Sequence, residues 1–138
     1  MNSRQKGARG EREAAAAWAT VMGCRARRGQ QFSGGTDSPD VVSDYGNIHL
    51  EVKRVERGNP YWWVEQAERD CGGKIPLVLH RKDRKDWLVI LRLADVPRLA
   101  KEIAAQAEAL DRGQVPGGVS DPGVPSAAAQ DAGQPGLL

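Results

Sequence analysis

SPDVV at residues 38–42 and IHLEVK at residues 48–53 decide the fold of this chain. Both stretches are rich in β-branched and aliphatic residues, which are typical of strands. Only a short polar segment, DYGN at residues 44–47, separates them, and its composition is that of a turn. We therefore expect two neighbouring strands that are joined as a hairpin.

Polar side chains gather on one face of the second strand. Apolar and polar residues alternate along it, so Glu51 and Lys53 project side by side from the same face. If the hairpin forms, Asp40 at the start of the first strand comes close to them. Two carboxylates and a lysine that converge at a sheet edge suit the binding of a divalent metal ion and the stabilisation of charge on a phosphate.

The rest of the chain supplies helices and strands around this hairpin. Helix-forming residues, glycine stops and short apolar runs predict helices at residues 7–22, 61–71 and 95–110 and strands at residues 24–32, 75–80 and 87–93. The polar link between the last two strands predicts a second hairpin. The expected order is αβββαββα, which is an α/β fold with a mixed sheet of about five strands flanked by helices.

The first predicted helix carries an acid in line with its apolar stripe. Glu11 lies at helical spacing from Ala14, Ala15, Trp18 and Met22. A carboxylate at the border of a buried face needs a partner or a purpose, because burial of an unpaired charge is costly. Glu11 is therefore a candidate site residue, and an ordinary surface acid is the alternative.

Length and composition indicate one globular domain followed by a tail. The 138 residues are enough for a domain with a modest core, which we place at residues 1–111. From residue 112 onward, glycine and proline supply ten of 27 residues and aromatic residues are absent, which predicts a disordered Gly/Pro/Ala-rich tail. The N-terminus lacks the apolar segment of a secretory signal, and no apolar run approaches membrane-spanning length. Two cysteines without metal-type spacing fit a cytoplasmic protein.

Basic residues are bunched along the chain, although the net charge is only +2. Local bunching suits contact with a polyanion better than the total charge does. In a nuclease such residues would grip backbone phosphates without reading the sequence, and a solvated surface is the alternative. The candidates are Arg9, Arg25, Arg27, Arg28, Arg54, Arg57, Arg81, Lys82, Arg84 and Lys85.

The order and spacing of these candidates resemble the signature of the PD-(D/E)xK nuclease superfamily. The stretches that carry the resemblance are GARGERE at residues 7–13, Pro39-Asp40, Glu51-Val52-Lys53 and Gln66-Ala67. Within the superfamily, the chain is most similar to archaeal-type Holliday junction resolvases and their phage-encoded relatives. The resemblance spans roughly residues 6 to 93 and implies a restriction-endonuclease-like core.

The resemblance also implies a metal centre that uses Mg²⁺, with Mn²⁺ as a substitute. Asp40 and Glu51 would ligate the ion, and the carbonyl group of Val52 would line the site. Glu11 would complete the metal shell, directly or through water. Hard cations prefer such oxygen ligands, which agrees with the chemistry of the residues themselves.

Two further residues would act on the substrate according to the same resemblance. Lys53 would activate the attacking water or stabilise the pentavalent phosphate, and Gln66 would orient the lysine or the nucleophile. Metal polarisation together with a generated hydroxide serves phosphodiester hydrolysis, and nearby acids can tune the proton affinity of a lysine.

Alternatives stay open for several residues near this site. Asp37 precedes Asp40 by three residues and could be the ligand in its place, although the apolar pair after Asp40 favours Asp40. His49 could reach a phosphate or be a polar neighbour. Trp62 and Trp63 could stack on unpaired bases, or pack in the core or at an oligomer interface.

The sequence therefore predicts a metal-dependent DNA endonuclease, and most specifically a structure-selective Holliday junction resolvase of recombination and repair. Such an enzyme would work as a homodimer in a bacterial or phage-infected cell, because two strands are cut in symmetry. One alternative is a flap, nick or degradative phage nuclease of the same fold. Others are a non-catalytic nucleic-acid-binding module, against which the intact acid and lysine set argues, and an interaction protein that recruits a partner through its tryptophans and tail.

Overall fold

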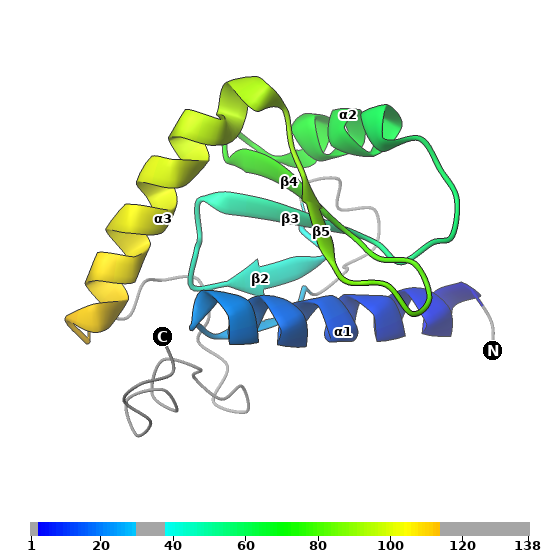
Figure 1. Cartoon of the computed structure of the whole chain (residues 1–138), viewed down its shortest axis with the longest axis horizontal. Helices are drawn as coiled ribbons and strands as arrows, with labels where there is room; N and C mark the ends of the chain where they lie inside the picture. Colours follow the sequence, from blue (N-terminus) through cyan, green and yellow to red (C-terminus); the bar gives the residue numbers. More distant parts are fainter. Residues whose placement is uncertain (1–2, 30–37, 114–138) are drawn as a thin grey trace.

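The computed structural model describes residues 3–29 and 38–113 (Figure 1). The predicted order of elements is confirmed, with a short 3-10 helix added before the last helix. Asp37 and almost all of the predicted tail lie outside the described residues. The elements are α1 (Ser3–Met22), β1 (Ala26–Arg28), β2 (Val41–Ser43), β3 (Ile48–Lys53), α2 (Pro60–Asp70), β4 (Ile75–His80), β5 (Leu88–Ile90), η1 (Leu93–Asp95) and α3 (Val96–Asp111).

The five strands form one mixed sheet in the order β1-β2-β3-β4-β5. β2 pairs with β3 antiparallel, as the hairpin prediction requires, and β4 pairs with β5 antiparallel. β3 and β4 run parallel from Ile48↔Ile75 to Lys53↔His80, and α2 makes the crossover that a parallel pair needs. β3 is therefore the central strand, and the expectation that its acids lie at a sheet edge was wrong. The local alternation could not indicate this, because the pairing with β4 is made by residues 27 positions away.

One face of the sheet packs against α1 and α3. Its core contains Ala14, Ala15 and Trp18 of α1 together with alternate residues of the strands, among them Leu50 and Leu77. The amphipathic stripe predicted for the first helix is thus confirmed. α3 adds only partly buried side chains to this core and has no fully buried residue of its own.

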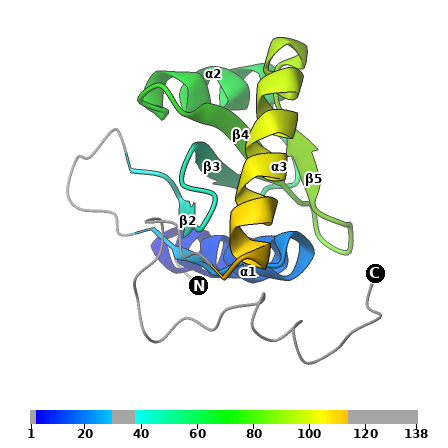
Figure 2. The same cartoon turned by 90° about the vertical axis from the view of Figure 1, so that its left-hand side faces the viewer.

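The opposite face of the sheet lies under α2. Figure 2 shows α1 and α2 on opposite sides of the strands β2 to β4. Asn59 caps α2 by accepting a hydrogen bond from the amide of Tyr61, and Pro60 occupies the first turn. Trp63 packs on the ring of His80, with centroids 4.6 Å apart, and Ala67 is fully buried. α2 therefore covers the face that carries the polar residues of β3.

Both cysteines are free thiols. Cys24 is fully buried, and burial raises the pKa of its thiol to about 12. Among the helices in the described ranges, none combines the length and the apolar character needed to cross a membrane.

Candidate active site

The backbone around Asp40 is held by its two neighbouring strands. The amide of Asp40 donates to the carbonyl of Leu50 at 2.9 Å, and its own carbonyl accepts from the amide of Gly29 at 2.8 Å. A side chain at Gly29 would not fit, because a Cβ there would lie 2.1 Å from the carbonyl oxygen of Pro39. The close packing of Gly29 against the Pro39 carbonyl therefore fixes the backbone position of Asp40.

The carboxylates of Asp40 and Glu51 share a partly enclosed site. Oδ2 of Asp40 accepts a hydrogen bond of 2.8 Å from the amide of Val52, and Glu51 is only 4% exposed. Burial, together with the nearby charge of Glu51, raises the pKa of Asp40 to about 7 against the opposing effect of the Val52 amide. Such a pair favours either a retained proton or a bound cation.

A buried histidine contacts one of these acids. Nε2 of His49 lies 2.7 Å from Oε1 of Glu51, and His49 is 1% exposed. The two residues are neighbours on the same face of β3, beneath α2. His49 is thus a polar neighbour of the site that contacts Glu51.

Lys53 and Gln66 meet between β3 and α2. Nζ of Lys53 donates a hydrogen bond of 2.8 Å to Oε1 of Gln66. The strand alternation places Lys53 on the same face as Glu51, and the helix period turns Gln66 toward that face. This contact brings together two residues that the sequence analysis selected from separate elements.

Glu11 lies near the acids and is paired with an arginine. Its Oε2 lies 2.5 Å from Nε of Arg28, and its charge contributes to the raised pKa of Asp40. Glu11 thus has a partner in Arg28, and its charge acts on Asp40, whereas its role in a metal shell stays a prediction. Arg28, a predicted DNA-binding residue, is the partner of this acid.

The donor set fits a hard divalent cation in its chemistry, since Asp40 and Glu51 bring oxygen ligands whose mutual repulsion a cation would relieve. Within residues 3–29 and 38–113, no group of three or more His, Cys, Asp or Glu side chains could hold a metal ion by itself. A cation beside Asp40 and Glu51 would therefore need backbone, water or phosphate oxygens to complete its shell. Asp37 lies outside the described residues.

The predicted DNA-binding residues fall into two groups, apart from Arg27. Several are engaged in ion pairs within the protein: Arg25 contacts Asp44 at 3.0 Å, and both Arg54 and Arg81 contact Glu13. Others are exposed and project from the surface, namely Arg9, Arg57, Lys82, Arg84 and Lys85. Arg27 is half-buried on β1, where its Nη1 donates to the carbonyl of Arg28.

The ion pairs of Glu13 tie three segments together. Arg54, which directly follows Lys53, also contacts Asp83 at 2.8 Å, so α1, the end of β3 and the β4–β5 turn are linked. A Cβ on Gly10 of α1 would lie 2.8 Å from Cβ of Arg54. The basic turn between β4 and β5 is thus fastened beside the strand that carries Lys53.

The comparison with protein families agrees with this arrangement. Residues 2–115 match the family described as "Phage putative PDDEXK endonuclease". A search of curated proteins and a search of solved structures found no match. The matched range covers most of the chain and includes every element of the sheet and all three α-helices. The chain therefore belongs to the phage PDDEXK endonuclease family of the PD-(D/E)xK superfamily.

Proposed function

We propose that this protein hydrolyses phosphodiester bonds of DNA with Mg²⁺, for which Mn²⁺ can substitute, and that its substrate is a branched DNA such as a four-way junction. The observation that carries the proposal is the convergence of four side chains. Asp40 and Glu51 interact on one side, and Lys53 contacts Gln66 on the same face of β3. Membership of the endonuclease family supports DNA as the substrate.

The acids are the proposed holders of the cation. Asp40 and Glu51 would bind it together with the carbonyl of Val52, and Glu11 would contribute directly or through water. A divalent ion bound there would polarise the phosphate and lower the pKa of a bound water. The hydrogen bond from the Val52 amide keeps one carboxylate oxygen of Asp40 in place for this task.

Lys53 and Gln66 are the proposed residues that act on the phosphate. The Lys53 ammonium carries three donors, and Gln66 accepts one of them at 2.8 Å. The remaining donors are available to stabilise negative charge on the phosphate or to orient a water molecule. Gln66 is then a positioning residue that acts through Lys53.

Selectivity for four-way junctions and a homodimeric state complete the proposal. They are supported by the resemblance to Holliday junction resolvases and by the presence of one set of site residues in a small domain. Two symmetric cuts would require two copies of such a chain. We place this nuclease domain at residues 1–111; the tail that follows lies, apart from residues 112 and 113, outside the described residues.

A substrate panel tests the proposal. The purified protein is incubated with labelled four-way junction, flap, nicked duplex, linear duplex and single strand, with Mg²⁺ and with chelator. Paired symmetric nicks at the junction that require Mg²⁺ are expected. Equal cutting of all substrates would leave a general nuclease, and a strict monomer on DNA in sedimentation would contradict the resolvase.

Two variants test the assignment of the site. E51Q and K53A are expected to bind the junction while losing cleavage. E65Q is a matched control, because Glu65 is an exposed acid on α2 outside the site. Full Mg²⁺-dependent activity in E51Q would show that the acids are assigned wrongly, and binding without cleavage by the unmutated protein under any metal would favour a non-catalytic module.

A further inference from the structure

Trp62 is the most exposed of the four tryptophans. Its exposed fraction is 69%, whereas Trp18 is 6% exposed and Trp63 and Trp87 are half-buried. A tryptophan offers a large apolar ring that gains free energy when another surface covers it. The exposed ring of Trp62 is therefore a candidate binding surface.

Trp62 lies next to the proposed active site. It precedes Gln66 by four positions on α2, and residues at this spacing are neighbours on the same face of a helix. Gln66 in turn holds Lys53. The indole of Trp62 therefore stands one helical turn from the glutamine that contacts the catalytic lysine.

The start of α2 fixes the backbone that carries Trp62. Trp63 is packed between His80 and Gly58, and a Cβ on Gly58 would lie 2.3 Å from its ring. The Asn59 cap and Pro60 define the first turn of the helix. Because the neighbouring tryptophan anchors the helix end, Trp62 presents its ring to solvent without needing any rearrangement.

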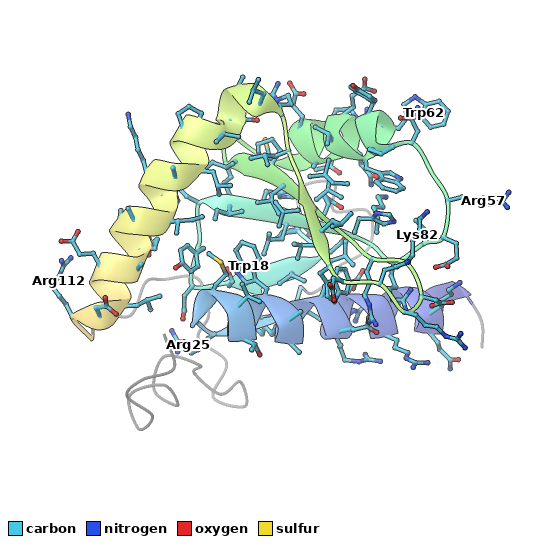
Figure 3. The ribbon with its side chains drawn as sticks, viewed as in Figure 1. Trp18, Arg25, Arg57, Trp62, Lys82 and Arg112 are labelled. Atoms are coloured by element: carbon cyan, nitrogen blue, oxygen red, sulfur yellow. The ribbon has the colours of Figure 1, made fainter. Side chains whose placement is uncertain are left out.

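The charges around Trp62 suit a nucleic acid. Figure 3 shows Trp62, Arg57 and Lys82 at the same end of the molecule, and both basic residues are exposed. Trp62 is not part of the apolar groove that Tyr61, Val64 and Leu93 line with neighbouring residues. An apolar protein surface would fit that groove, whereas an exposed aromatic ring at the same end of the molecule as exposed cations fits a base with its phosphates.

We propose that Trp62 stacks on an unpaired nucleobase of the DNA bound at the site, which rests on the proposed function. A base within a continuous duplex has both faces covered by its neighbours and cannot offer one to the indole. A base at a branch point, at a gap or in a single-stranded arm has a free face that the indole can cover. Trp62 thereby makes the protein prefer DNA in which a base beside the cleaved phosphate is unstacked.

Binding measurements with three variants test this proposal. W62A, W62F and Y61A are compared on a gapped duplex and on a continuous duplex, with Ca²⁺ in place of Mg²⁺ so that cleavage is suppressed. Loss of one stacked base weakens binding by about tenfold. W62A is expected to lose this much on the gapped duplex and little on the continuous one. W62F should keep most of the affinity, and Y61A, whose exposed ring lines the groove, should behave like the unmutated protein.

A fluorescence measurement reports stacking directly. Because Trp62 is the most exposed tryptophan, binding of a single-stranded oligonucleotide should quench the protein fluorescence, and the quenching should be lost in W62F. An equal loss of affinity on both duplexes, or unchanged quenching in W62F, would overturn the stacking role. If the unmutated protein cleaves DNA and W62A binds both duplexes normally, the stacking role of Trp62 is refuted but the proposed function is not. Absence of both binding and cleavage would refute the proposed function as well.

Discussion

Nε2 of His49 lies 2.7 Å from Oε1 of Glu51, and both side chains are buried beneath α2. The contact occupies one oxygen of an acid that we propose as a metal ligand. A buried partner of this kind fixes the direction in which a carboxylate points. The strand alternation brings the two residues to one face of β3, and α2 covers that face.

We predict that H49A raises the Mg²⁺ concentration needed for half-maximal cleavage by about tenfold, because loss of such an outer partner weakens metal binding. H49Q, which can restore a donor, should recover part of the loss. H80Q is the matched control, since His80 of β4 contacts the carbonyl of Val55, which follows β3, and not an acid of the site. An unchanged Mg²⁺ dependence in H49A would mean that the histidine only fills space.

We predict that D40N stabilises the metal-free protein at pH 8 and not at pH 4. The pKa of Asp40 is about 7 in the fold against an ordinary value of 3.8, so the fold retains a proton that the unfolded chain loses between these values. The stabilising contribution of Asp40 is therefore complete below about pH 4 and is lost as the pH rises through about 7. Asparagine removes the titration and can still accept from the Val52 amide.

Urea unfolding with chelator, measured from pH 4 to pH 8, checks this prediction. The difference between D40N and the unmutated protein should grow from about pH 4 to about pH 7 and then level off, and added Mg²⁺ should stabilise only the unmutated protein. D86N, which changes an exposed acid in the β4–β5 turn, is the control and should show no such trend. A difference that shrinks as the pH rises would contradict the raised pKa.

Local patterns made a large part of this site predictable. Alternation along β3 placed Glu51 and Lys53 on one face, and the helix predicted at residues 61–71 contained Gln66, which the family resemblance selected. The partners that come from distant segments could not be predicted in the same way. Arg81 and Glu13 are separated by 68 positions, and their contact depends on how α1 crosses the sheet. Both residues read equally well as solvated charges in the sequence.

We predict opposite effects for two sets of basic residues. R54A should lower the free energy of unfolding by on the order of 1 kcal/mol, because Arg54 contacts Glu13 and Asp83 at the surface. It should leave the salt dependence of DNA binding nearly unchanged. The double variant K82A/K85A should keep its stability and reduce the slope of log affinity against log salt by about two.

Unfolding curves and salt titrations of DNA binding separate these outcomes. K101A, which alters an exposed lysine of α3, controls for a general loss of positive charge. A normal salt slope in K82A/K85A would remove the β4–β5 turn from the DNA interface. If R54A keeps its full stability and shows a reduced slope of log affinity against log salt, Arg54 contacts DNA phosphates, as the sequence suggested.

Finally, we predict that the effect of Gln66 on cleavage disappears when Lys53 is absent. Gln66 accepts from Nζ of Lys53 at 2.8 Å, and in the proposed function it acts only through this lysine, so Q66A should slow single-turnover cleavage by about tenfold with little change in DNA affinity. K53A should slow it much further, and K53A/Q66A should be no slower than K53A. Two residues that act as one unit give such a non-additive double-mutant cycle, whereas the rate losses of two independent residues would multiply. If the double variant is slower than K53A by the full factor of Q66A, the glutamine acts on water or phosphate by itself.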